Sequence, residues 1–226
     1  LKKYSKVPFE VVYLSMDPGY SPENREKMLS GAAALGIVPE VFETDIYSIV
    51  EGVAHSPCHV CAAMRRGYLY KEAQKRGCNK IALGHHRDDV AETILLSILY
   101  GGQFKTMMPR LKSENYQGME LVRPLYLVRE KAILNWLAST DIATTTCACR
   151  VTRNPDGGKR ARVKRLLSEL EGEQANIIDN IIASSENVNL STLISYKAHE
   201  KAEATSFMAQ FAPEGEAGMM EVDSLF

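Results

Sequence analysis

Two short cysteine pairs are the residues of this 226-residue chain best suited to chemistry. Two residues separate Cys58 from Cys61, one residue separates Cys147 from Cys149, and Cys78 stands alone. An odd number of unevenly spaced cysteines argues against a disulfide framework and favours metal ligation or thiol chemistry. We expect Cys78 to be inert and half-buried, because a free cysteine behaves mostly as a small hydrophobic side chain.

The second feature is the turn His85-His86-Arg87-Asp88-Asp89, which follows an apolar segment and opens a helical one. The helix dipole favours carboxylates at the start of a helix, which is sufficient reason for Asp88 and Asp89 to lie there. A second interpretation is a magnesium-bound nucleotide, since Mg²⁺ prefers hard oxygen ligands and bridges to phosphates. The residues alone leave both interpretations open, and His86 is equally consistent with a packed histidine.

Strand and helix patterns alternate as far as about residue 140 and must position these residues. Strands are predicted at 11–15, 38–44, 80–83 and 121–124, and helices at 23–35, 61–76, 88–100 and 128–139. This alternation predicts an α/β fold with a doubly wound parallel sheet. Such folds bind ligands at the carboxyl ends of their strands, where the turns at Asp17 and at His85 to Asp89 would both lie.

A change of pattern near residues 145–155 predicts a domain boundary. The first part, 1–150, carries all the predicted strands, whereas the second, 151–226, shows no strand signal and has helical periodicity at 163–170 and 177–182. From about Ala202 we expect a loosely held tail with an acidic end. The isoleucines of the last helical segment could pack within one chain or across a homodimer, and the homodimer is favoured. They are Ile177, Ile178, Ile181 and Ile182.

The composition is that of an ordinary globular protein, with 45% hydrophobic residues and a net charge of -1. No apolar run approaches the roughly 18 residues of a membrane span. No signal-peptide pattern stands at the start of the sequence. We therefore expect a cytoplasmic protein that does not bind a membrane.

Basic residues gather directly after the second cysteine pair, although the net charge gives no sign of them. Asp156 is the one acidic residue in this basic segment, 150–165. A solvated helix face is the ordinary reason for such a run. Its position beside one cysteine pair, with two arginines beside the other, favours an RNA-facing surface, because phosphate contacts provide most of the affinity for nucleic acid. The residues are Arg65, Arg66, Arg150, Arg153, Lys159, Arg160, Arg162, Lys164 and Arg165.

Taken in order, these motifs resemble one known family over roughly residues 7–200. The matching segments are Cys58-x-x-Cys61-x-x-x-Arg65-Arg66-Gly67, Lys80 to Asp89, Tyr100-Gly-Gly102, Arg123-Pro-Leu125 and Arg129-Glu-Lys131, with Asp45 to Val50 ahead of them. The chain resembles the TtcA family, the tRNA 2-thiocytidine synthetases of the PP-loop ATP pyrophosphatase superfamily.

The resemblance implies a reaction and its cofactors. Members use ATP to adenylate the C2 oxygen of a cytidine at tRNA position 32, release pyrophosphate, and then replace AMP by sulfur. The implied partners are tRNA and a sulfur donor, either sulfide or a cysteine desulfurase. The nucleotide and its Mg²⁺ would be bound by Asp17, Gly84, His85, Asp88 and Asp89, with Asp89 also catalytic.

The resemblance also implies a [4Fe-4S] cluster held by three cysteines, with one iron open to the incoming sulfur. Cys58 and Cys61 match the first two ligands and would be catalytic as well. Cys147 is favoured as the third ligand, and Cys149 is the alternative because this pair is one residue shorter than the family's usual spacing. Two other uses of the cysteines remain: a structural zinc site with four thiolates and a persulfide sulfur carrier at Cys58 or Cys61.

One family motif, the phosphate loop Ser-Gly-Gly-x-Asp-Ser, is not found in the sequence. Since the chain begins at Leu1 within what looks like the tail of a helix, we expect that residues upstream carry the loop. Two functional alternatives follow: a noncatalytic, zinc-stabilised RNA-binding module, and an ATP pyrophosphatase that thiolates a uridine or acts on another substrate.

Overall fold

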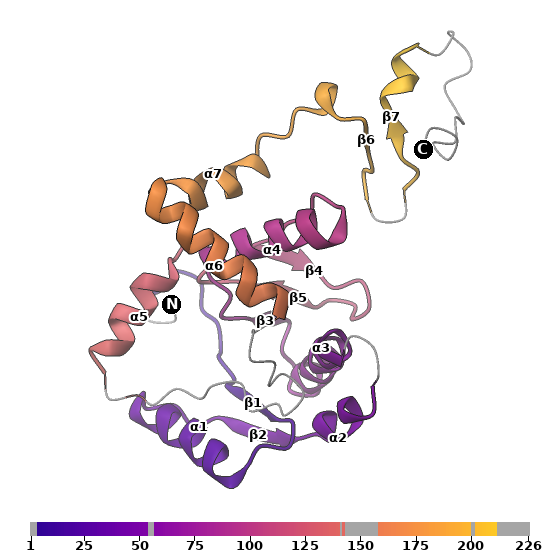
Figure 1. Ribbon diagram of the computed structural model, residues 1–226. Helices are drawn as coiled ribbons and strands as arrows, with labels where there is room; N and C mark the ends of the chain where they lie inside the picture. The colour runs from indigo at the N-terminus through magenta and orange to yellow at the C-terminus, as the bar shows by residue number, and fades with distance from the viewer. Residues whose placement is uncertain (1–3, 54–56, 141, 143–157, 200–201, 212–226) are drawn as a thin grey trace. The chain divides into compact units, whose positions relative to one another are not determined.

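The computed structural model describes residues 4–53, 57–140, 142, 158–199 and 202–211, and for 57–59 and 210 it describes the backbone alone. By its internal contacts the chain divides into two units, 1–179 and 180–226. The domain boundary predicted at 145–155 falls largely on residues outside the described ranges and stays a prediction. In the first unit, helices and parallel strands alternate, so the predicted α/β class is confirmed (Figure 1).

A strand–helix–strand unit begins the fold. The strands β1 (Leu14–Asp17) and β2 (Glu40–Glu43) pair in parallel, joined by α1 (Pro22–Ala34). The Ser21 side chain accepts a hydrogen bond from the Asn24 backbone N–H, and Pro22 occupies the first turn; both residues favour the start of a helix. The strand starts three residues later than predicted and runs through Asp17, because β2 pairs only with 14–17.

The second sheet has the strand order β3–β5–β4. The strands β3 (Lys80–Ala82) and β5 (Glu120–Val122) are parallel, while β4 (Arg110–Lys112) pairs with β5 in the antiparallel direction. The strand β4 was not predicted from the sequence, because its three residues are all exposed and are too few for their polar–apolar–polar order to indicate a strand. The fold is therefore not purely parallel.

The helix α3 (Pro57–Lys75) packs against both β1 and β3 and so joins the two sheets. Its Tyr70 and Ala73 form a buried cluster with Met119 and Leu121. Tyr70 also stacks on Tyr116, with 4.7 Å between ring centroids. The helix ends before Gly77, whose φ of 69° is a left-handed conformation that a glycine adopts without strain.

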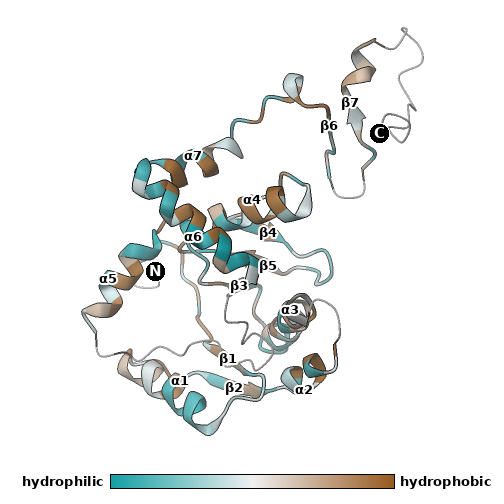
Figure 2. Cartoon of the chain, viewed as in Figure 1, coloured by the Kyte–Doolittle hydropathy of each residue, from teal (hydrophilic) through white to brown (hydrophobic). Residues whose placement is uncertain are grey.

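Four further helices complete the described part of the first unit. The helices α4 (Arg87–Gly101) and α5 (Glu130–Ala138) lie where the sequence predicts them, whereas α2 (Ile46–Glu51) was not predicted. The basic segment forms α6 (Gly158–Glu173), which packs on α4. Figure 2 shows polar residues along most of α6, and its Val163 and Leu167 are buried.

The chain crosses into the second unit within α7 (Ile177–Ser184), where Ile178 and Ile182 are buried. Two short antiparallel strands, β6 (Ser195–Tyr196) and β7 (Thr205–Ser206), follow, so the expectation of no strand beyond residue 150 was wrong. The 3-10 helices η3 (Leu190–Thr192) and η4 (Phe207–Phe211) flank them. None of the helices in the described ranges combines the length and apolar character that a membrane crossing requires.

We expect Glu120 to stabilise the second sheet in a pH-dependent manner. Its carboxylate accepts hydrogen bonds from Arg110 and is 2.8 Å from Lys80 Nζ, and these two cations lower the pKa of Glu120 to about 2. A carboxyl whose pKa is lower in the folded state stabilises that state fully above its unfolded pKa of about 4.3, and the effect is lost as the pH falls toward the folded pKa.

Thermal unfolding of the Glu120→Gln variant should therefore show a melting temperature below wild type at pH 7, with the difference shrinking from about pH 4 downwards. The matched control is Glu114→Gln, which changes an exposed glutamate of the same hairpin with no ion pair in the described residues. A difference between Glu120→Gln and wild type that is constant over this pH range would contradict the assignment.

Candidate active site

The turn His85 to Asp89 forms a capping box at the start of α4. The His86 side chain accepts a hydrogen bond from the Asp89 backbone N–H at 3.4 Å, and the Asp89 carboxylate accepts one from the His86 backbone N–H at 2.9 Å. Such reciprocal bonds satisfy donors that a helix start leaves open. This arrangement favours the interpretation of His86 as a packed residue, with Nδ1 as the acceptor.

Asp88 joins the first turn of α4 to α5. Its carboxylate accepts hydrogen bonds from Arg129 Nε and Nη2 at 3.1–3.3 Å and from the Glu130 backbone N–H at 2.7 Å. Burial raises the pKa of Asp88, but the bonds from Arg129 and Glu130 outweigh burial, so that the pKa is lowered. Asp88 is therefore a charged group with both oxygens engaged inside the protein.

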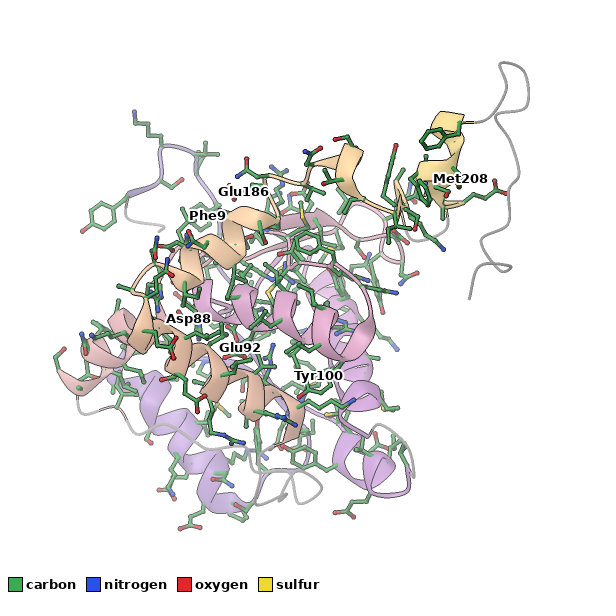
Figure 3. All side chains as sticks on the ribbon, turned by 45° about the horizontal axis from the view of Figure 1, so that its top comes forward. Phe9, Asp88, Glu92, Tyr100, Glu186 and Met208 are labelled. Carbon is green, nitrogen blue, oxygen red and sulfur yellow. The ribbon has the colours of Figure 1, made fainter. Side chains whose placement is uncertain are left out.

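Glu92 faces α6 (Figure 3). Asp89 also lies near α6, through Arg160. Arg160 Nε lies 3.3 Å from Glu92 Oε2, and Arg160 Nη1 lies 3.7 Å from Asp89 Oδ1. Glu92 is only 4% exposed, and burial, with Asp89 nearby, raises its pKa although Arg160 opposes the shift. Glu92 was not predicted from the sequence as a site residue, although a glutamate within the mainly apolar segment Val90 to Ile94 is a usable signal.

The contacts divide the basic residues of α6 into two groups. Arg160 pairs with acids of α4, and Lys164 pairs with Glu130 at 2.6 Å. Lys159 lies 4.9 Å from the ring centroid of Tyr100. Arg162 and Arg165, in contrast, are exposed and have no ion pair within the described ranges. The two remaining predicted residues, Arg150 and Arg153, lie outside those ranges.

The first cysteine pair lies in the first turns of α3. Cys58 and Cys61 are three residues apart on this helix, so their backbone positions lie on the same face of it. Cys61 is half-buried, and only the backbone of Cys58 is described. Because Cys147 and Cys149 lie outside the described residues, the predicted convergence of thiolates stays a prediction. No group of three or more His, Cys, Asp or Glu arranged to hold a metal ion occurs in the part described.

The next turn of α3 carries the two arginines predicted beside the first cysteine pair. Arg66 is exposed. Arg65 is half-buried, and its Nε is covered and has no acceptor among the residues that the structure describes. Since α3 packs on β3 and is joined to it by a short connection, helix and strand run in opposite directions. The start of α3 therefore lies toward the carboxyl end of β3, where Gly84 and His85 follow.

Asp17 is the last residue of β1 and is 4% exposed. Its carboxylate accepts hydrogen bonds from the backbone N–H groups of Gly19 at 3.0 Å and Tyr20 at 2.7 Å, and lies 3.4 Å from Arg25 Nη1. These bonds hold the turn that follows β1, so they favour the interpretation of Asp17 as a turn residue. A contact to a nucleotide stays a prediction.

His85 and Arg123 lie at the carboxyl ends of neighbouring strands, and each has a buried nitrogen without a partner in the described residues. Burial lowers the pKa of His85; the charge of Arg123 also lowers it, while Asp89 opposes the shift. The sequence analysis named Arg123 only as part of a motif and gave it no role. The spacing of residues in the sequence does not show which side chains at a strand end lack hydrogen-bond partners, because this depends on the fold.

The fold and this strand-end site define the class of protein. A family model described as a PP-loop domain matches residues 54–147. The tRNA-cytidine(32) 2-sulfurtransferase of Geobacter sulfurreducens is 35% identical over 191 residues, covering 83% of this chain and 74% of the relative. That of Alcanivorax borkumensis is 36% identical over 204 residues, covering 85% and 68%. The chain belongs to the tRNA-cytidine(32) 2-sulfurtransferase family.

Among solved structures, the chain is similar to the U34-tRNA thiolase NcsA from Methanococcus maripaludis with its [4Fe-4S] cluster. The TM-score is 0.60 and the sequence identity 18%, and the match covers 85% of this chain and 68% of the thiolase. At this identity the likeness supports the fold.

We expect replacement of Arg129 by glutamine to destabilise the protein. The change removes the guanidinium that binds Asp88 and also bonds to Glu171 at 2.6 Å, leaving a largely covered carboxylate short of donors. The expected loss in the free energy of unfolding is about 1–3 kcal/mol, measured by urea denaturation. The control, Arg162→Gln on α6, should stay within about 0.5 kcal/mol of wild type. Equal stability of the two variants would contradict the role given to Arg129.

Proposed function

We propose that this protein is an ATP-dependent tRNA sulfurtransferase that replaces the C2 oxygen of cytidine 32 by sulfur. The observation that carries the proposal is the identity of 33–36% to relatives named tRNA-cytidine(32) 2-sulfurtransferase over most of the chain. The position of the candidate site agrees with it, because α/β folds bind nucleotides at the carboxyl ends of parallel strands.

The proposed reaction has two steps. The cytidine C2 oxygen attacks the α-phosphorus of ATP, and the bond to pyrophosphate breaks. A sulfur nucleophile then adds to C2, the C2–O bond breaks with its electron pair leaving on AMP, and one proton is released. A carbonyl oxygen is a poor leaving group, whereas a phosphate ester leaves readily, which is why ATP is consumed.

Magnesium and the nucleotide would be held at the start of α4. Asp89 is the better magnesium ligand of the two aspartates, because both oxygens of Asp88 are engaged by Arg129 and Glu130. Among the described residues, the one cation within ion-pair distance of Asp89 Oδ1 is Arg160, at 3.7 Å. Hard carboxylate oxygens suit Mg²⁺, which would bridge to the phosphates. Gly84 and His85 precede this turn and would lie beside the nucleotide.

The soft donor set of the chain suits an iron–sulfur cluster. Cys58 and Cys61, on one face of α3, would supply two ligands, and Cys147 would supply the third, with Cys149 as the alternative. When bound, a cluster with an open iron would hold the incoming sulfur, delivered by sulfide or a cysteine desulfurase. Structural zinc at the same thiolates is the competing occupant.

The decisive experiment combines metal analysis with nucleoside analysis. Protein purified without oxygen should contain iron and acid-labile sulfide, and both should be lost in Cys58→Ser and Cys61→Ser together with thiolation of tRNA. The matched control Cys78→Ser changes a half-buried cysteine that we expect to be inert. Comparison of Cys147→Ser with Cys149→Ser identifies the third ligand.

In a strain that lacks the protein, 2-thiocytidine should disappear from tRNA. Unchanged 2-thiocytidine, or zinc in place of iron with no thiolation, would refute the proposal. Loss of a thiolated uridine instead would favour the uridine-thiolating alternative.

The tRNA should contact the exposed cations of α6. Since Arg162 and Arg165 have no ion pair within the described ranges, they are free to bind phosphates. Their replacement by alanine should weaken tRNA binding and reduce the slope of log K against log salt by about 1–2. The control is Lys27→Ala, an exposed lysine of α1. An equal salt dependence for both variants would place the tRNA elsewhere.

A further inference from the structure

Arg123 follows the last residue of β5, the central strand of its sheet. Its backbone N–H donates to the Pro109 carbonyl at 2.9 Å, so that the extended pairing continues to this residue. Side chains alternate between the faces of a sheet, which puts Arg123 on the same face as Leu121. Leu121 packs in the buried cluster with Tyr70 and Ala73 of α3. Arg123 therefore lies on the face that α3 covers.

No carboxylate accompanies Arg123 among the described residues. Six other arginines have a carboxylate partner within ion-pair distance: Arg25, Arg76, Arg87, Arg110, Arg129 and Arg160. Arg123 is half-buried, donates one hydrogen bond from Nη1 to the Met108 carbonyl, and has Nε covered without an acceptor. Burial lowers the pKa of Arg123, and only two tyrosines oppose the shift.

Burying a guanidinium that has unused N–H donors costs free energy unless an anion accepts hydrogen bonds from them. His85 lies close by, since Ala82 and Val122 are partners in the parallel register and the Leu83 backbone N–H donates to the Val122 carbonyl at 3.0 Å. Its Nδ1 is also buried without a partner. At the carboxyl ends of two adjacent strands, His85 and Arg123 thus each have a buried nitrogen without a partner among the described residues.

We propose that Arg123, with His85 beside it, binds the α-phosphate of the nucleotide. The inference rests on the proposed function, which supplies the anion. The choice of the α-phosphate follows from the face of the sheet, because Arg123 lies on the side covered by α3, and the first turns of α3 carry Cys58 and Cys61 at the same edge. Sulfur and the oxygen of the departing phosphate are both bonded to C2 in the addition intermediate, so the α-phosphate must lie close to the incoming sulfur.

Arg123 would act on the leaving group. As the C2–O bond of the adenylated cytidine breaks, its electron pair passes to the AMP phosphate, whose negative charge grows. A guanidinium donating to the non-bridging oxygens stabilises that charge more in the transition state than before it. His85 would donate from Nδ1 to the same group.

Equilibrium binding of AMP and of adenosine to the purified protein tests the inference, because the two ligands differ only in the α-phosphate. Wild type should bind AMP more tightly than adenosine. Arg123→Gln should weaken AMP binding by about 10- to 100-fold and leave adenosine unchanged. Arg123→Lys, which keeps the charge but loses the planar fork, should be intermediate. The control Arg110→Gln changes an exposed arginine of the adjacent strand β4 and should bind AMP as wild type does.

Three outcomes overturn the inference: a wild-type protein that does not prefer AMP, an Arg123→Gln variant with the wild-type preference, or a variant that loses tRNA affinity instead. If the melting curve shows that Arg123→Gln does not fold, the Arg123→Lys variant takes its place. The quantity compared with wild type is then its ratio of AMP affinity to adenosine affinity. A different measurement tests the proposed function: the wild-type protein should form AMP from ATP only when tRNA is present. Absence of this AMP formation would refute the proposed function, whatever the result for Arg123.

Discussion

The ion pair between Asp88 and Arg129 is the contact on which the arrangement of the candidate site depends. The Asp88 carboxylate is engaged by Arg129 and by the Glu130 backbone N–H, and the same guanidinium reaches Glu171 of α6. The first turns of α4 and α5 and the last part of α6 are thereby joined. Because bidentate hydrogen bonds between charged groups are directional, they fix where α4 begins. The direction of the preceding turn, with Gly84 and His85, follows from that.

The same network determines which cations remain for ligands. Acids of α4 and α5 take up Arg160, Lys164 and Arg129, so a basic segment that looks uniform in sequence has two kinds of member in the fold. Cations paired with carboxylates hold the helices together. If such a cation left its carboxylate to bind an RNA phosphate, a covered carboxylate such as Glu92 would lose its partner. Only exposed, unpaired side chains contribute counterion release without that cost.

The features that the sequence predicted are those that depend on neighbours in the chain. The strand–helix alternation and the positions of α4 and α5 follow from local preferences. The strand β4 was missed because its stability comes from pairing with β5 rather than from its own pattern. The partners of Asp88 were missed since 41 residues separate it from Arg129. The sequence does predict which groups are charged, but the fold decides which of them face each other.

The two strand ends of the first unit differ in what they leave for a ligand. At β1, Asp17 bonds to the backbone of its own turn and approaches Arg25, so its acceptors are satisfied inside the protein. At β3 and β5, His85 and Arg123 each have a buried nitrogen without a hydrogen-bond partner in the described part of the chain. Buried groups without partners are rare in folded proteins and mark places where a ligand completes the structure. A helix that precedes a strand by a short connection and packs on it is antiparallel to that strand. The start of α3 and its cysteines therefore lie toward the carboxyl ends of β3 and β5. Chain direction alone thus brings the first cysteine pair to the same end of the sheet as His85 and Arg123.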